Sequence, residues 1–269
     1  MTEFSADWLA LREPYDHVAR NPAVLDEVAG LFVDQPSISV VDLACGTGST
    51  FRAIAEHLPS RQSWRLVDND LGLLARAANL ARSPGIGIVT RPVDLVRDLE
   101  LALEGPLDLV TISALLDLVS LEWLDRLAIE AAARRLPVYA ALTYDGRARI
   151  APSESADLEI LARVNAHQRT DKGFGPALGP SAAARAVERF GQVGYEVVQG
   201  HSDWLLGSGD RAIQEALFAG WAELAMQNGK VSSGVVSGWL ACRRSHLAAG
   251  RSSLTVGHLD IFARPIGTR

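Results

Sequence analysis

The sequence lacks the features that mark several large classes of protein. Cysteine occurs only as Cys45 and Cys242, too few and too far apart for a disulfide framework or a cysteine-rich metal cluster. No run approaches the roughly 20 apolar residues that cross a bilayer. The chain does not open with the basic start and apolar stretch of a signal peptide. We therefore expect a cytoplasmic location and no membrane partner.

An excess of positive charge is also missing. The net charge is −6, and an acidic chain does not attract phosphate backbones, so we expect no nucleic-acid partner. One local basic stretch (Arg243, Arg244, His246 and Arg251) is interpreted as a solvated helix face rather than a phosphate-binding patch. Repeats and low-complexity tracts are absent from the sequence, and its length fits a single domain over residues 1–269.

From residue 37 onward, the sequence alternates between two kinds of apolar pattern. Short segments rich in β-branched residues are typical of strands buried on both faces, and they cover 37–44, 63–68, 86–93, 107–114 and 137–144. Between them, apolar residues repeat at helical spacing, as over 51–58 and 124–131. This alternation predicts a parallel sheet with right-handed helical crossovers.

The two ends of the chain have a different pattern. Residues 1–36 are expected to form a helical lid, interrupted at Pro14 and continuing over 21–32. Residues 37–150 are interpreted as a cofactor-binding half, and 151–269 as an acceptor-side half with a helical insertion at about 207–250. In that second half we expect a loop over 169–180, strands over 195–199 and 253–263, and helices over 153–168 (Ser153 as N-cap), 181–191, 210–228 and 235–248.

The segment VVDLACGTG at 40–48 lies where the first strand becomes a helix. Such a turn must bend sharply and let a ligand approach the backbone, which Gly46 and Gly48 permit. Thr47, Ser49 and Thr50 are candidate caps of the following helix. Asp68 stands twenty residues after Gly48, at the end of the next strand. A carboxylate there can accept hydrogen bonds from both hydroxyl groups of a ribose.

A nicotinamide dinucleotide is the main alternative ligand for these glycines. The dinucleotide pattern requires a third small residue where this chain has Phe51. Asp42 ends the first strand, where its charge would repel a pyrophosphate and would favour a cationic sulfonium and an α-amino group. Both features favour a sulfonium cofactor.

Together, residues 40–50 and Asp68 resemble the cofactor loop of the class I (Rossmann-like) S-adenosylmethionine-dependent methyltransferases. The resemblance covers 40–145 well and 181–200 loosely. It implies a doubly wound α/β fold whose seven-stranded sheet is mostly parallel, with an antiparallel last strand. Many members have glycine where this chain has Ala44, and alanine is tolerated there if φ is negative.

The same resemblance implies S-adenosyl-L-methionine as cofactor and names the residues that would hold it. An acid at Asp94 would face the adenine amino group. Arg12, on the N-terminal helix, could pair with the cofactor carboxylate, or could be an ordinary surface arginine. The predicted cofactor residues are Asp42, Ala44, Cys45, Gly46, Gly48, Asp68, Asn69, Asp94, Leu95, Ser113 and Arg12.

Three residues are candidates for the chemistry at the methyl acceptor. Asp117 could be a general base, or the cap of a helix near 121. Tyr144 ends the fifth strand and would line a pocket. His167 leads into the 169–180 loop, where it would serve a substrate lid or stand at a solvated helix end. His201 and Trp204 are expected in the core.

The leading hypothesis is therefore a methyltransferase that acts on an oxygen or nitrogen atom of a small molecule. The alternatives are a catalytically silent S-adenosylmethionine-binding regulator or scaffold and, less favoured, an NAD-dependent oxidoreductase. No His/Cys cluster supports a metal site, so none is predicted. The sequence does not identify the acceptor or the oligomeric state.

Overall fold

The computed structural model describes residues 5–80, 84–227 and 231–267. Their strands form one mixed sheet in the order β3-β2-β1-β4-β5-β8-β6. Among the described helices, none is long and apolar enough to cross a membrane. The strands along this path are β1 (Ile38–Leu43), β2 (Gln62–Asp68), β3 (Ile86–Pro92), β4 (Leu109–Ser113), β5 (Val138–Ala151), β6 (Tyr195–His201) and β8 (Ser253–Pro265).

The strand directions match the predicted fold class. Strands β1 to β5 pair in parallel, and β8 runs antiparallel between β5 and β6. The predicted doubly wound sheet with an antiparallel last strand is therefore confirmed. One short strand was not predicted: β7 (Trp204–Leu206) pairs with β8 beside β6. The expectation that all five early strands are buried on both faces is wrong for β3, an edge strand on which Val89 is 57% exposed.

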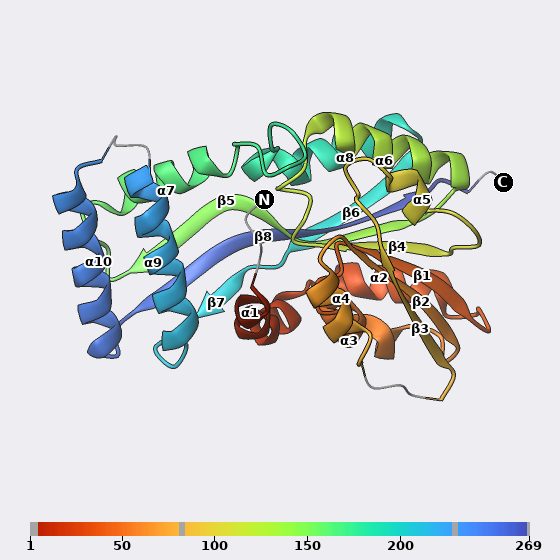
Figure 1. Ribbon diagram of the computed structural model, residues 1–269, viewed down its shortest axis with the longest axis horizontal. Coiled ribbons are helices and arrows are strands. Elements are labelled where there is room, and N and C mark those ends of the chain that lie inside the picture. The colour runs from red at the N-terminus through yellow and green to blue at the C-terminus, as the bar shows by residue number, and fades with distance from the viewer. Residues whose placement is uncertain (1–4, 81–83, 228–230, 268–269) are drawn as a thin grey trace.

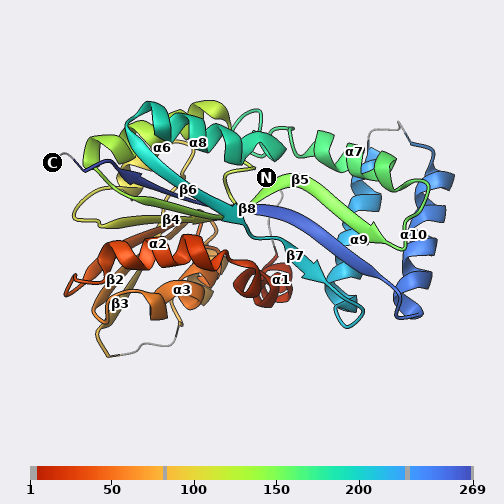
Figure 2. The ribbon, with the colours of Figure 1, turned by 180° about the vertical axis from the view of Figure 1, so that it is seen from behind.

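Helices cover both faces of the sheet (Figures 1 and 2). On one face, buried side chains of α2 (Pro22–Phe32), α3 (Ser49–Ile54) and α4 (Leu71–Ala77) pack on the strands. On the other face, α5 (Leu99–Ala102), α6 (Leu121–Arg134) and α8 (Ala182–Gln192) do the same. The short helix η1 (Ala55–His57) follows α3. These layers fix the carboxyl ends of the parallel strands at one edge.

The N-terminal helix α1 (Ala6–Ala19) runs through Pro14 without a break, contrary to the predicted interruption. A proline donates no hydrogen bond to the carbonyl four residues earlier, here that of Ala10. Both residues are exposed, so water can satisfy that carbonyl. The helix therefore continues to Ala19, and Arg20 and Asn21 join it to α2.

The strands β5 and β8 are much longer than the others, at 14 and 13 residues, and extend beyond the parallel sheet (Figure 1). Around this extension pack α7 (Asp157–His167), α9 (Arg211–Gln227) and α10 (Ser233–Ala248), which share one apolar core with β7. Helices α9 and α10 lie where the insertion at about 207–250 was predicted. The first residue of α7 is Asp157, and the residue before it is Ala156, so Ser153 is not its cap.

A buried ion pair supports this second core. The Arg243 guanidinium on α10 is fully buried, and its Nη2 donates to both oxygens of Asp157 at 2.8 and 2.9 Å. Trp239 Nε1 donates to the same carboxylate at 2.7 Å. The predicted basic stretch is therefore not a wholly solvated helix face, because Arg243 is buried and His246 contacts Glu154. Only Arg244 and Arg251 are exposed.

Candidate functional site

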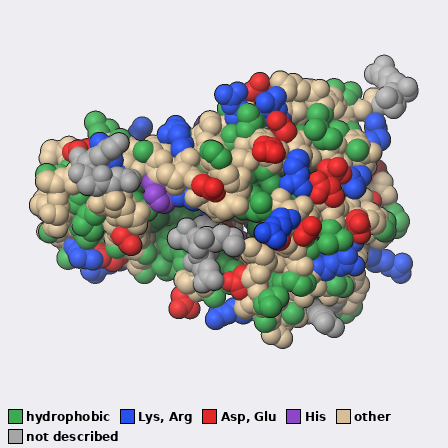
Figure 3. Space-filling model, turned by 45° about the horizontal axis from the view of Figure 1, so that its top comes forward, with side chains coloured by type: hydrophobic (Ala, Val, Ile, Leu, Met, Phe, Trp, Pro, Cys, Tyr) green, Lys and Arg blue, Asp and Glu red, His purple; other side chains and the backbone are tan. Residues whose placement is uncertain are grey.

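A cavity of about 1060 Å³ opens where the carboxyl ends of the parallel strands meet. Its wall is formed by residues that follow β1, β2 and β4, together with parts of α1, β5, α7, α9 and the β7–β8 pair. Figure 3 shows a hollow with hydrophobic side chains on its visible floor. Pockets for a single small ligand measure about 300–1,000 Å³. The volume lies at the upper end of this range.

The backbone after β1 turns sharply at one end of the cavity. Ala44, Gly46 and Gly48 have φ values of 54°, 55° and 84°. We expected alanine to be tolerated at position 44 if its φ were negative. The φ of Ala44 is positive, so this condition is not met, and Ala44 has a backbone conformation that favours glycine. The Cys45 amide donates to the Val67 carbonyl at 2.9 Å, which joins the turn to β2.

Asp68 is locked beside this turn. Its Oδ2 accepts from the Gly46 amide at 2.8 Å, and its Oδ1 accepts from the Asp70 amide at 3.0 Å. The side chain lines the cavity, and each oxygen keeps a second lone pair for a ligand hydroxyl. The Cys45 thiol also lines the cavity, and burial raises its pKa, so it stays protonated and unreactive.

Asp42 lies beneath the turn, outside the cavity lining. It is fully buried, and its Oδ1 accepts from Thr111 Oγ1 at 2.7 Å. Burial raises its pKa to about 7, because the charged form is poorly solvated there. We predicted that Asp42 and Gly48 contact a cofactor directly, but neither residue lines the cavity, so this prediction is corrected. The argument that Asp42 faces a sulfonium or repels a pyrophosphate is corrected for the same reason.

Ser113 ends β4 and joins two buried groups beside the turn. Its Oγ accepts from Thr50 Oγ1 at 3.0 Å and from Arg20 Nη2 at 3.1 Å. Thr50 therefore bonds to β4 and does not cap α3, whose N-cap is Gly48 with no side-chain cap. Arg20 was not identified from the sequence. It is buried, and its Nη1 donates to Tyr139 Oη at 3.3 Å.

The other predicted cofactor residues of the sheet edge also line the cavity. Asp94 Oδ1 accepts from the Val96 amide at 3.0 Å, which turns this short loop after β3. The Leu95 carbonyl accepts from Trp123 Nε1 at 2.7 Å, so the loop is tied to α6. Asn69 follows Asp68 in the same wall. The structure thus brings Asp68, Asn69, Asp94 and Leu95 together.

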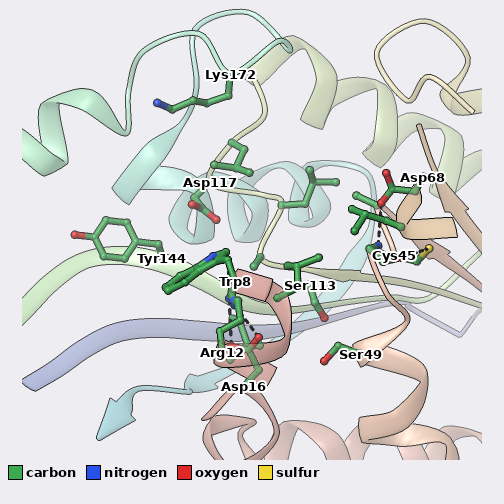
Figure 4. A pocket seen from close by; sticks show the side chains of 18 of the residues that line it. Trp8, Arg12, Asp16, Cys45, Ser49, Asp68, Ser113, Asp117, Tyr144 and Lys172 are labelled. Carbon is green, nitrogen blue, oxygen red and sulfur yellow. Dashed lines mark hydrogen bonds and ion pairs between the residues drawn. The ribbon is translucent and has the colours of Figure 1, made fainter. Parts of the chain in front are cut away.

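Arg12 lies in the cavity wall on α1 and is not an ordinary surface arginine. Its Nε and Nη2 donate to the two oxygens of Asp16 at 2.8 and 3.2 Å. The guanidinium stacks 5.1 Å from the ring centroid of Trp204, whose Nε1 also donates to Asp16. Figure 4 shows Arg12 and Asp16 joined below Trp8. This wall is therefore set before any ligand binds.

Asp117, after β4, points into the cavity (Figure 4). It is 5% exposed, and its Oδ1 has no hydrogen-bond partner among the described residues. Burial raises its pKa to about 6. The alternative that it caps the next helix is wrong, because Ser120 accepts from the Trp123 amide at the start of α6.

Tyr144 and His167 line the same cavity as Asp117. Tyr144 Oη donates to Asn165 Oδ1 at 2.8 Å, and burial raises its pKa, so the phenol stays protonated. His167 ends α7, and its Nδ1 lies 2.9 Å from Lys172 Nζ. Burial and the neighbouring ammonium lower the pKa of His167, which keeps the ring neutral.

Several lining residues were not predicted as site residues, because they come from distant segments. His258 on β8 is buried between the rings of Tyr144 and Trp204, and burial lowers its pKa to about 3. Trp8 on α1 and Trp221 on α9 complete an aromatic wall. Only their place in three dimensions identifies them, since each fits an ordinary apolar pattern in the sequence. His201 is exposed, so its expected core position is wrong.

Asp145, His201 and Asp203 form a group whose ligand atoms lie within 4.8 Å of one another. Arg147 already supplies positive charge there. Its Nε donates to Asp145 at 2.6 Å and its Nη2 to Asp203 at 2.8 Å. This cluster is therefore a salt-bridge network, and the prediction that the protein uses no metal stays a prediction.

Comparison with known proteins finds a family match for part of the chain. Residues 40–137 match a family model described as a methyltransferase domain. No curated protein sequence matches the chain. The matched residues include the turn after β1, Asp68, Asp94, Ser113 and Asp117.

Solved structures with a similar fold share little sequence with this chain. A putative type II methyltransferase from Anaeromyxobacter dehalogenans is 16% identical, with a TM-score of 0.53, and the alignment covers 93% of this chain and 98% of that one. The cyclopropane synthase MmaA2 from Mycobacterium tuberculosis is 13% identical, with a TM-score of 0.52 and coverages of 97% and 95%. These likenesses confirm the predicted fold, and the family match confirms the predicted methyltransferase resemblance.

Proposed function

We propose, on the premise that residues 40–137 form a class I methyltransferase domain, that the chain transfers a methyl group from S-adenosylmethionine to oxygen or nitrogen of a small molecule. One observation carries the proposal. The turn bracketed by Asp68 lines the same cavity as Asp117, whose Oδ1 has no hydrogen-bond partner among the described residues.

The cofactor end of the cavity fits an adenosine with an attached amino acid. The second lone pairs of Asp68 are free for two ribose hydroxyls, and Asp94 and Leu95 form the wall for an adenine. Arg12, through the guanidinium donors that Asp16 leaves free, and Ser113, through its hydroxyl proton, would donate to the cofactor carboxylate. When bound, S-adenosylmethionine supplies a methyl group on a positively charged sulfur.

At the acceptor end, Asp117 is suited to accept a proton. Its pKa of about 6 leaves it ionised at neutral pH, yet close enough to that pH to take a proton from an acceptor hydroxyl or amine. The rigid Arg12–Asp16–Trp204 wall holds the acceptor in line with the methyl group, which is the main requirement of the reaction. Tyr144 and His167 act as positioning residues beside it.

Phe51 argues further against a dinucleotide. It is buried and packs edge-on against Trp64 with ring centroids 5.2 Å apart, where a dinucleotide loop needs a small residue. Asp42 does not reach the cavity, so the case against a dinucleotide rests on Phe51 and not on Asp42.

The proposal is tested in two steps. First, S-adenosylmethionine, S-adenosylhomocysteine and NAD are each added, and the midpoint of thermal unfolding is measured. The first two should raise it, and stabilisation by NAD alone would contradict the proposal. Second, methyl-labelled S-adenosylmethionine is incubated with the protein and a metabolite extract. Cofactor binding without any labelled product would favour the silent regulator.

A further inference from the structure

Lys172 places an ammonium group at the acceptor end of the cavity. It lies in the loop between α7 and η2 (Gly179–Ser181), above Asp117 and Tyr144 in Figure 4. Only two of the 26 basic Lys and Arg residues in the chain are lysines. A lysine differs from an arginine in being a compact point charge on a flexible stem.

The groups that contact Lys172 carry no negative charge. Its Nζ lies 2.9 Å from His167 Nδ1 and donates to Thr170 Oγ1 at 3.1 Å. In the part of the chain that the structure describes, it forms no ion pair. The adjacent acid, Asp171, is already used by the loop, because its Oδ1 accepts from the Gly173 and Gly175 amides.

The other cations in the cavity wall are already neutralised. Arg12 is held by both oxygens of Asp16. Arg20 is buried with Tyr139, which in turn donates to Asp260. The nearest opposite charge to act on Lys172 is the Asp117 carboxylate, with which it forms no ion pair among the described residues. Burial also lowers its pKa, which shows that its charge is poorly solvated and would gain from an anion.

The wall around Lys172 is apolar and aromatic. Phe174 follows it in the loop and packs edge-on against Trp123, with ring centroids 5.6 Å apart. Leu217 and Trp221 of α9 also line this cavity. A ligand that reaches Lys172 must therefore place an apolar body against these side chains.

We propose that the methyl acceptor is an apolar carboxylic acid whose carboxylate pairs with Lys172, while its nucleophilic oxygen or nitrogen faces Asp117. This inference rests on the proposed function, because it places the acceptor in the cavity beside the cofactor. Asp117 and Lys172 form no ion pair with each other. They therefore hold two separate groups of the ligand.

Three probes with the same apolar body test the charge preference. They are naphthalene-2-carboxylate, naphthalene-2-carboxamide and naphthalen-2-ylmethylammonium, titrated by calorimetry into the protein saturated with S-adenosylhomocysteine. The carboxylate should bind about tenfold more tightly than the amide, since it gains a charge-assisted hydrogen bond. The ammonium should bind most weakly. In Lys172→Met the carboxylate should lose this advantage, and the amide should bind as before.

The amide is the internal control, because unchanged amide affinity shows an intact cavity. Lys172→Arg, which keeps the charge, should retain the preference for the carboxylate. Equal binding of carboxylate and amide to the wild type, a preference that survives Lys172→Met, or no binding of any probe would each overturn the inference. Failure of S-adenosylhomocysteine to bind would instead overturn the proposed function, and the same titrations without it would still test Lys172.

Discussion

The two ends of the cavity differ in how their polar atoms are used. At the cofactor end, the carboxylates of Asp68 and Asp94 already accept backbone amides. At the acceptor end, Asp117 Oδ1 and His258 Nδ1 have no partner among the described residues. Buried polar atoms are normally satisfied, so the acceptor end is incomplete without a ligand. The carboxylates of Asp68 and Asp94 are thus held by the backbone, whereas Asp117 and His258 keep polar atoms for a second molecule. Beneath the turn, Arg20 Nε and Asp42 Oδ2 also have no partner among the described residues.

The largest effect is expected from Asp117→Asn. If Asp117 takes the proton, kcat/KM for an acceptor recovered from the extract should fall by about 10²–10⁴-fold. The wild-type kcat/KM should fall as the pH drops below about 6, because only the ionised carboxyl is a base, and its pKa is about 6. The variant should lose this pH dependence.

A titration tests the same group without any acceptor. Carboxyl-carbon NMR should show one signal with a pKa near 6 that disappears in Asp117→Asn. Asp125→Asn on α6, an exposed control, should leave both measurements unchanged. A pH profile that is the same in Asp117→Asn and the wild type would remove Asp117 from the chemistry.

The next largest effect is expected on the stability of the second apolar core, which α7, α9 and α10 form. Asp157→Ala leaves the Arg243 charge buried without a partner, which should lower the free energy of unfolding by about 3–5 kcal/mol. Urea denaturation measures this loss. Arg244→Ala breaks an exposed pair with Glu215 and should cost less than about 1 kcal/mol. Similar losses in both variants would contradict the buried-pair argument.

At the cofactor end, Asp68→Ala should weaken S-adenosylhomocysteine binding by about 1–3 kcal/mol, because charge-assisted hydrogen bonds to the ribose are lost. Calorimetry measures the affinity, and Asp125→Ala is again the surface control. Asp117→Asn, at the other end of the cavity, should keep the wild-type affinity for S-adenosylhomocysteine, which would separate the roles of the two ends. An unchanged affinity in Asp68→Ala would remove this carboxylate from the cofactor site.

The smallest effect is expected from Ala44→Gly. The positive φ of Ala44 disfavours a side chain, so glycine should raise the free energy of unfolding by up to about 1 kcal/mol. Ala53→Gly on α3 is the matched control, because glycine within a helix should lower it by about 1 kcal/mol. A loss of stability in both variants would show that the turn places no strain on Ala44.

The cofactor end could be predicted because its parts lie in consecutive strand–helix units. Gly46 follows β1, Asp68 ends β2 and Asp94 follows β3, and parallel strands bring their carboxyl ends to one edge. Asp42 was misplaced, since sequence alone does not show which residue of a turn faces the ligand. His258 and Trp221 could not be predicted, because an apolar strand and an apolar helix offer no sign of the cavity between them.

The paired strands β5 and β8 extend from the parallel sheet to the core of α7, α9 and α10 as one hydrogen-bonded ribbon. The parallel sheet and this second core therefore share two strands, whose register shifts between Ala140 and Thr143 and between Tyr144 and Ala148. Helix α1 and the loop that carries Lys172 border this cavity. If the cavity binds a methyl donor and an acceptor as proposed, this shared ribbon would set the distance between them when the chain folds, before either ligand arrives.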